Sequence, residues 1–153
     1  MAMLKNYSVR YAVIADIEKM IDLLNQLFSI EADFEIDPVK QRSGLELLLK
    51  SEHAQLFVAE DHDGNVVAMT SLQMVISTAE GGVVAWVEDV VVDVFHQGKG
   101  IGGILLSHIT EWAESREIKR LQLVADKNNH SALDFYRKHD WSETELLVLR
   151  RKY

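Results

Sequence analysis

Hydrophobic residues recur three and four positions apart in the segment that follows Asp16, which is the spacing of one face of an amphipathic helix. The positions that share this face are Ile17, Met20, Ile21, Leu24 and Leu27. Aspartate commonly caps the start of a helix, so we predict a helix that begins directly after Asp16. A second helix is predicted over residues 38–49, because the only proline, Pro38, suits the first turn of a helix.

Runs of apolar and β-branched residues predict strands that are joined by short turns. The strands are predicted over residues 8–13, 55–60, 66–77 and about 83–94. Asp63-Gly64-Asn65 is typical of a hairpin turn, and Glu80-Gly81-Gly82 supplies a second turn. We therefore expect the last three of these strands to form an antiparallel meander.

The second half of the chain alternates helices with strands. A glycine-rich turn precedes a helix that is predicted to end near Arg116, with Ile101, Leu105, Ile109, Trp112 and Ala113 on its apolar face. A strand over residues 121–125, a helix over 130–138 and a last strand over 145–151 follow. Because a strand–helix–strand unit makes a right-handed crossover, two strands should be parallel. The pattern predicts one α+β domain over residues 1–153, with a mixed, mostly antiparallel central sheet flanked by helices.

The composition narrows the class of protein. A chain of 153 residues with 48% hydrophobic content suits a single domain with a real core. It has no apolar run long enough for a membrane span, and its first ten residues lack the features of a secretory signal. The absence of cysteine excludes disulfides and fits a cytoplasmic protein. No pair of histidines has metal-ligand spacing, so no metal is expected, and the net charge of −8 argues against a nucleic-acid partner.

The glycine-rich turn over residues 98–103 joins an apolar strand to an apolar helix. Such a turn presents backbone N–H groups at the positive end of a helix dipole, which suits a diphosphate. Its spacing also satisfies the G-x-G-x-x-G pattern of dinucleotide sites, with Asp126 as a possible ribose ligand. Too few strand and helix units follow for a doubly wound sheet, which weighs against that alternative.

Two motifs resemble those of the GNAT N-acetyltransferases. Gln97-x-x-Gly100-x-Gly102, preceded by Val90-Val91-Val92, is similar to the family's acetyl-CoA motif, with glutamine in the place of the commoner arginine. The second motif is Asn129-x-x-Ala132-x-x-Phe135-Tyr136-x-Lys138-x-Asp140-Trp141, in which Asp140 takes the usual position of a glycine. Together the motifs cover about residues 84–141.

The resemblance implies that acetyl-CoA is the acetyl donor and that the parallel strand pair is splayed. The diphosphate is expected on the N–H groups of the turn, and the pantetheine arm between the two strands, where Asn129 and Ser131 would hydrogen-bond the coenzyme. The residues implied in coenzyme binding are Val90, Val91, Val92, Gln97, Gly98, Lys99, Gly100, Ile101, Gly102, Gly103, Asn129, Ser131 and Ala132. The resemblance also implies a homodimer.

Amine acetylation makes two chemical demands. Removing a proton from an alkyl amine costs about 4–5 kcal/mol at neutral pH, and a carboxylate can accept that proton. Glu88 is the candidate, because its position resembles that of the glutamate in diamine and glucosamine-6-phosphate N-acetyltransferases; it either takes the proton or binds the amine. Asp89 is assigned a structural role. Tyr136 matches the family's general-acid tyrosine, which gives a proton to the departing thiolate.

The segment after the first helix carries an acidic, aromatic set of residues that suits a cationic amine: Phe28, Glu31, Asp33, Phe34 and Glu35. The sequence does not distinguish a polyamine, an amino sugar, an amino acid, an aminoglycoside or a protein lysine as the acceptor. We predict direct transfer of acetyl to the primary amine of a small molecule in a ternary complex. The alternatives are a protein or peptide N-acetyltransferase and a non-catalytic CoA-binding sensor module.

Overall fold

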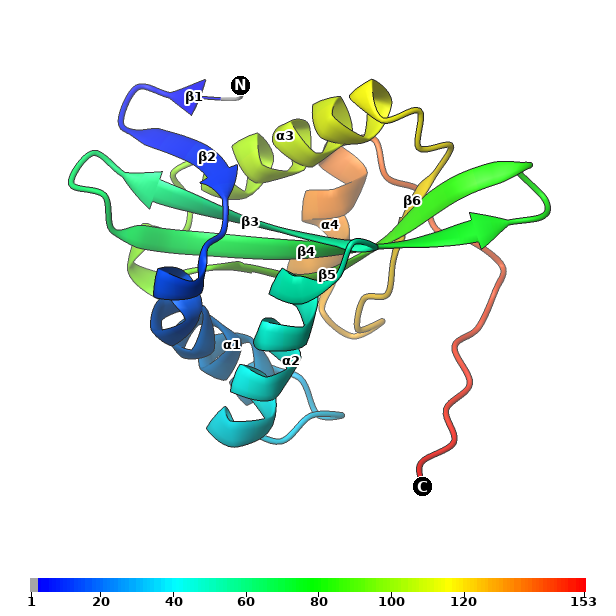
Figure 1. The fold of residues 1–153 in the computed structure, drawn as a ribbon, viewed down its shortest axis with the longest axis horizontal. Helices are drawn as coiled ribbons and strands as arrows, with labels where there is room; N and C mark the ends of the chain where they lie inside the picture. Colours follow the sequence, from blue (N-terminus) through cyan, green and yellow to red (C-terminus); the bar gives the residue numbers. More distant parts are fainter. Residues whose placement is uncertain (1–2) are drawn as a thin grey trace.

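The computed structural model describes residues 3–153 and shows one six-stranded sheet in the order β1-β2-β3-β4-β5-β6 (Figure 1). The strands are β1 (Met3–Leu4), β2 (Tyr7–Tyr11), β3 (Ala54–Asp61), β4 (Val66–Ser77), β5 (Gly82–Val92) and β6 (Leu121–Leu123). The helices are α1 (Ile17–Ile30), α2 (Pro38–Lys50), α3 (Ile101–Ser115) and α4 (His130–Lys138), with short 3-10 turns at Ile14–Asp16 and Val94–His96. All pairs are antiparallel except β5 with β6. The predicted α+β class and the mixed, mostly antiparallel sheet are confirmed.

Helices cover both faces of the sheet, and each face has its own buried cluster. Helices α1 and α2 lie on one face and α3 on the other, as Figure 1 shows. On the first face, Met20 and Leu45 pack with Met69 of β4. On the second, Leu105 and Ile109 of α3 pack on strand residues, and α4 joins this cluster through partly buried aromatic side chains. The helical spacing in the sequence therefore identified the faces that the structure buries.

The parallel strand pair is splayed. Residues 85–87 of β5 pair with residues 121–123 of β6, and the pairing stops there. Beyond that point β5 continues to Val92 beside β4 alone. The strand predicted over residues 121–125 therefore ends at Leu123, and residues 88–92 keep one edge without a neighbouring strand. This open edge is the gap that the resemblance implies for a coenzyme arm.

A β-bulge interrupts β5 at the start of the splay. Ser71 of β4 opposes Glu88, whereas Met69 opposes Val91, so β5 carries one extra residue. Asp89 lies in the bulge with φ of 55°, a left-handed conformation that costs most residues free energy and that aspartate tolerates better than most. The hydroxyls of Thr70 and Ser71 both donate to the Glu88 carbonyl, at 3.1 and 3.4 Å, and stabilise the bulge.

Two local predictions are wrong. Asp16 forms no side-chain cap on α1; its carboxylate instead accepts from the Val13 N–H at 2.8 Å and pairs with Arg10, so it stabilises the 3-10 turn before the helix. The strand predicted over residues 145–151 is absent, since this part of the described chain has no regular structure. A strand needs a partner edge, and no backbone hydrogen bond of the loops and turns joins residues 142–153 to the rest of the described chain.

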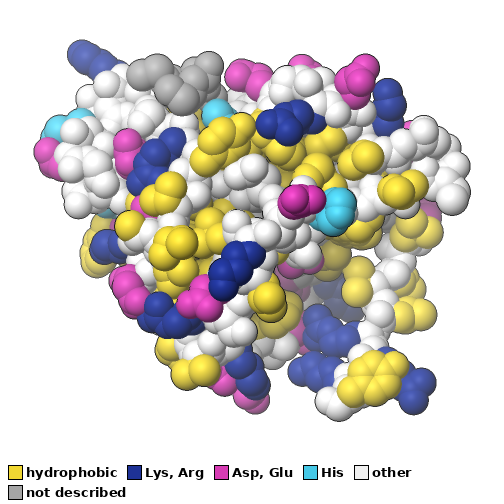
Figure 2. Space-filling model, viewed as in Figure 1, with side chains coloured by type: hydrophobic (Ala, Val, Ile, Leu, Met, Phe, Trp, Pro, Cys, Tyr) yellow, Lys and Arg dark blue, Asp and Glu magenta, His cyan; other side chains and the backbone are white. Residues whose placement is uncertain are grey.

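These residues, 142–153, form a C-terminal tail that leaves the sheet and runs toward the side of α2 (Figure 1). Its apolar side chains are in water: Leu147 is 87% exposed and Leu149 is 90% exposed. Figure 2 shows the tail as a projection with Lys and Arg side chains gathered at its end. Alternating hydrophobicity alone was therefore not sufficient to add a strand here. In residues 3–153, no helix is long and apolar enough to cross a membrane.

Candidate active site

The glycine-rich turn before α3 keeps its backbone donors free. Gly98 and Gly100 have φ of 75° and 82°, which only glycine adopts without strain. The side chains around them bond within the turn: Gln97 Nε2 donates to the Val92 carbonyl and Lys99 Nζ to that of Phe95, both at 3.1 Å. Among the turn and loop hydrogen bonds of the described chain, none uses the N–H groups of residues 98–100. The exposed turn thus offers unpaired donors at a helix N-terminus, which fits an anionic diphosphate.

The last two glycines of the turn have a different role. A Cβ atom on Gly102 would lie 2.9 Å from Cζ of Phe135, and one on Gly103 would lie 2.9 Å from Nε2 of His139. Both glycines therefore allow α4 to pack closely against the first turn of α3. Ile101, between the two pairs of glycines, is buried in the core on this face. In the six-residue motif, residues 98–100 are exposed and keep their N–H groups free, whereas Gly102 and Gly103 allow two helices to pack closely.

The other residues implied in coenzyme binding lie along the splay and at the start of α4. Val90 and Val92 are partly buried against the α3 cluster, and Val91 is buried on the opposite face. Asn129 caps α4, because its Oδ1 accepts from the Ala132 N–H at 3.1 Å. Ser131 is exposed in the first turn of that helix. The cap orders the helix that carries Tyr136.

Tyr136 lies on α4 with its ring against two other aromatic rings, Phe135 at 5.2 Å and Trp141 at 5.9 Å between centroids. Burial raises the pKa of its phenol to about 12, and the negative charge of Glu31 adds to that effect. The phenol therefore stays protonated at physiological pH and presents a hydrogen-bond donor.

Two neighbouring carboxylates at the bulge have different surroundings. Glu88 is exposed. Asp89 is half-buried and lines a cavity, and its burial, together with repulsion from Glu88 and Glu31, raises the pKa of its carboxyl to about 6. The usual pKa of an aspartate side chain is 3.8. Asp89 thus has the environment expected of a functional acid or base, although the sequence assigned it a structural role.

Sequence reasoning preferred Glu88 to Asp89, and it relied on strand alternation, which assigns one of two consecutive acids to each face. The bulge breaks that alternation. The only sequence signal for it was the hydroxyl pair Thr70-Ser71, which holds the bulge from the neighbouring strand. Such a pair is too common in strands to have predicted a bulge on its own.

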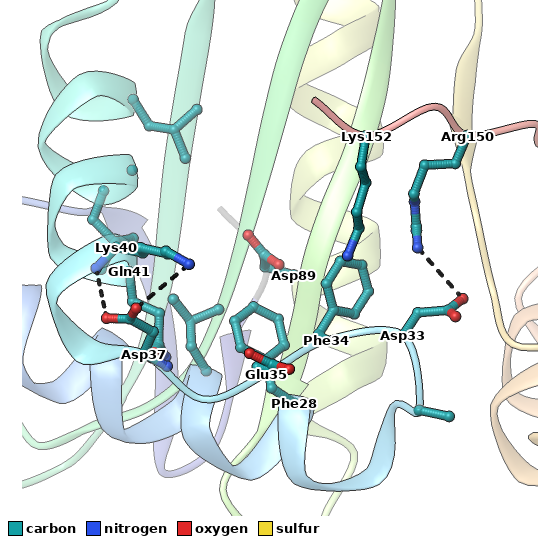
Figure 3. Close-up of a pocket in the computed structure, with 15 residues that line it drawn as sticks. Phe28, Asp33, Phe34, Glu35, Asp37, Lys40, Gln41, Asp89, Arg150 and Lys152 are labelled. Carbon is teal, nitrogen blue, oxygen red and sulfur yellow. Dashed lines mark hydrogen bonds and ion pairs between the residues drawn. The ribbon is translucent and has the colours of Figure 1, made fainter.

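The cavity has a volume of about 660 Å³ and lies between α1, α2, the loop that joins them and the end of the tail. Phe28 and Phe34 form an aromatic wall, with ring centroids 5.3 Å apart, and α2 contributes Gln41 and Leu45. Figure 3 shows the Asp89 carboxylate at the centre of this set, with no hydrogen bond or ion pair to the other residues that line the cavity. An unpaired carboxylate in a partly apolar cavity favours a cationic ligand.

The part of the chain that the structure describes contains no group of three His, Cys, Asp or Glu side chains arranged to hold a metal ion. The chemistry of the site is therefore argued from its carboxylates, its phenol and its backbone donors.

Comparison with known proteins supports the resemblance to the GNAT N-acetyltransferases. The model of the acetyltransferase (GNAT) family matches residues 17–141. A Bacillus subtilis protein named "Putative phosphinothricin acetyltransferase YwnH" is 28% identical over 140 residues, which are 89% of this chain and 84% of that protein.

Two solved structures have the same fold. A possible acetyltransferase from Clostridium difficile 630 has a TM-score of 0.86 at 21% identity, over 97% of this chain and 99% of that one. The enzyme AAC(6')-Iy, solved with a CoA-containing bisubstrate analogue, has a TM-score of 0.79 at 16% identity, again over 97% and 99% of the two chains. The chain belongs to the GNAT family of acetyltransferases and is an acetyl-CoA-dependent N-acetyltransferase.

Proposed function

We propose that this protein transfers the acetyl group of acetyl-CoA to the primary amine of a small molecule, by direct attack in a ternary complex. The observation that carries the proposal is the position of the Asp89 cavity at the start of the splay between β5 and β6. An amine in that cavity and a thioester in the splay would meet at the bulge.

The coenzyme half of the site is built from backbone groups. The diphosphate would accept from the free N–H groups of the turn at residues 98–100, and the pantetheine arm would lie beside the unpaired edge of residues 88–92. Asn129 and Ser131 would contact the arm or the adenine portion from the start of α4. A bound coenzyme would in this way span the distance from the turn to the bulge.

A carboxylate at the bulge would prepare the amine for attack. An alkyl ammonium with a pKa near 10.4 must lose a proton first, and a base with a pKa near the working pH removes it most effectively. Asp89, with its pKa of about 6, suits this role and faces the cavity. Glu88, the residue that the resemblance implies, is the second candidate and lies exposed beside it.

Tyr136 would assist the departing sulfur. A phenol with a pKa of about 12 is a weak acid toward a thiolate, whose usual pKa is near 8.5. Its contribution is therefore a hydrogen bond that strengthens as negative charge develops on sulfur. The sulfur takes up the proton that the attacking nitrogen loses as the amide forms.

The proposal is tested first by binding and then by turnover. Titration calorimetry with acetyl-CoA and with NAD separates the coenzyme from the dinucleotide alternative, and binding of NAD alone would overturn the assignment. An amine library with acetyl-CoA and thiol detection then measures transfer. Tight binding of acetyl-CoA without transfer to any amine would instead identify a CoA-binding sensor, and transfer only to peptides would identify a protein acetyltransferase.

The expected partners follow from the same proposal. We expect a homodimer in the cytoplasm, with a small-molecule amine as the only other ligand and with neither nucleic acid nor membrane bound. Sedimentation equilibrium measures directly whether the protein is a homodimer, and a monomer at micromolar concentration would contradict that expectation.

A further inference from the structure

The Asp89 cavity is acidic on several sides. Four carboxylates line it: Asp33, Glu35 and Asp37 from the loop before α2, and Asp89 from β5. Asp37 is already engaged, since it caps α2 and lies 3.6 Å from Lys40 Nζ. Glu35 and Asp89 have no ion pair among the described residues, Asp33 has only a long one to the tail, and Glu31 adds its charge near Asp89.

The chain places its own cations in this cavity. Arg150 Nη1 of the tail lies 3.8 Å from Asp33 Oδ2, and its guanidinium lies 5.4 Å from the centroid of the Phe34 ring. Lys152 also lines the cavity, and Figure 3 shows its side chain directed toward the ring of Phe34. Two cations on flexible aliphatic stems thus occupy a space between aromatic rings and carboxylates.

The tail is held at its end mainly by these side chains. Residues 142–153 have no regular structure and take part in none of the backbone hydrogen bonds that join loops and turns of the described chain. Its apolar residues, such as Leu149, lie in water. Exposed ion pairs contribute little stability, so a ligand with similar chemistry could displace the tail.

We propose that the acceptor carries at least two cationic groups and that the tail is a tethered stand-in for it. The proposal rests on the proposed function, because it assigns the acceptor side of that same site. The reacting amine lies at Asp89, and a second cation takes the place of the Arg150 guanidinium, between Asp33 and the ring of Phe34. Amines that carry a phosphate or phosphinate are disfavoured, because their anion would face the unpaired carboxylates of the cavity.

The reaction balances for such an acceptor. The ammonium gives one proton to the carboxylate at the bulge, and the amine nitrogen then forms a bond to the acetyl carbon while the carbon–sulfur bond breaks and a second proton passes from that nitrogen to the sulfur. The products are the monoacetylated amine, which keeps its second cation, and the free CoA thiol; one proton is released to water. Acetylation removes one charge, so the product is held less strongly than the substrate.

The first experiment compares acceptors that differ in one charge. Thiol release from acetyl-CoA is measured with butylamine, putrescine and glucosamine 6-phosphate. We expect kcat/KM for putrescine to exceed that for butylamine by at least about fivefold, the equivalent of one favourable ion pair, and glucosamine 6-phosphate to be the poorest acceptor. Equal values for putrescine and butylamine, or a preference for the phosphate, would overturn the proposal. Absence of transfer to every amine would instead contradict the proposed function.

Two pairs of variants locate the second cation and the tail. Asp33→Asn should bring the putrescine-to-butylamine ratio toward one, whereas Asp63→Asn, an exposed carboxylate on the distant β3–β4 turn, should leave it unchanged. The double variant Arg150→Ala, Lys152→Ala should lower KM for putrescine by about threefold with kcat unchanged, because a competing intramolecular ligand is removed. Arg151→Ala is its control, since Arg151 stacks on Tyr153 and does not line the cavity. An unchanged KM in the double variant would overturn the role of the tail.

Discussion

The two halves of the site are built from different parts of the polypeptide. The proposed coenzyme side consists of backbone N–H groups in the turn at residues 98–100 and the unpaired edge of residues 88–92. The proposed acceptor side is a cavity lined by side chains, among them Asp33, Phe34 and Asp89, which come from segments far apart in the sequence. A backbone site depends on glycine spacing and strand ends, whereas a side-chain site depends on how distant elements pack. The first kind is therefore recognisable in one sequence, and the second is not.

The largest effect is expected from the acceptor side. Asp89→Asn should lower kcat/KM by about 100-fold, the lower range for loss of a general base. In the unaltered protein the rate should fall as the pH drops through about 6, because Asp89 must be ionised to accept a proton. That acidic limb should be missing in the variant. A pH–rate profile from pH 5 to 9 measures both effects.

Glu88→Gln is the matched control for Asp89→Asn, because the two carboxylates are neighbours on the same strand. We expect Glu88→Gln to keep the acidic limb and to move it to slightly lower pH, since Glu88 contributes to the raised pKa of Asp89. If the limb disappears in Glu88→Gln and persists in Asp89→Asn, the glutamate is the base, as the resemblance implies.

A smaller effect is expected where the two halves meet. Tyr136→Phe should lower kcat by about 30-fold with little change in KM, because it removes a hydrogen bond that matters only as charge develops on sulfur. Stopped-flow or steady-state thiol release measures the change. Tyr11→Phe is the control, since this tyrosine is half-exposed on β2. A rise in KM for acetyl-CoA with kcat intact would mean that Tyr136 binds the coenzyme instead.

The packing half of the glycine turn is tested through stability. Gly102→Ala should destabilise the fold by about 1–2 kcal/mol, because the added methyl group would lie 2.9 Å from the Phe135 ring. Gly44→Ala in α2 has open space around it and should stabilise the fold by about 0.5–1 kcal/mol, since alanine favours a helix. Urea unfolding of both variants measures whether the free energy of unfolding falls or rises. A stabilised Gly102→Ala would show that α4 does not depend on this contact.

The smallest effect concerns the cost of keeping Asp89 ionised. Its raised pKa means that the folded state disfavours the charged form, so this group stabilises the fold below its unfolded pKa of about 4 and less so as the pH rises through about 6. Asp89→Asn should therefore raise the free energy of unfolding by about 1 kcal/mol at pH 7, and the gain should shrink toward pH 4. Thermal unfolding at both pH values measures it. A variant that is less stable at pH 7 would indicate that the carboxylate has a structural partner.

Most of the fold, and the exposed glycine-rich turn of the candidate site, could be predicted from the sequence. Helix α4 and strand β4 have the predicted bounds, because their apolar spacing and flanking turn residues agree. The strand predicted over residues 145–151 is absent. Alternating hydrophobicity marks residues that suit a strand, but it does not show whether a neighbouring strand is available for pairing. The bulge at Asp89 could not be predicted because it depends on the neighbouring strand, and the position of Arg150 depends on a contact with Asp33 that spans most of the chain.

The close contact of Gly102 and Gly103 with α4 has a consequence for the kinetic scheme. Any adjustment of the turn when it binds the coenzyme is passed to the helix that carries Tyr136, whereas none of the described residues that line the amine cavity belongs to that helix. The enzyme should consequently follow a compulsory sequence in which acetyl-CoA adds first and CoA departs last.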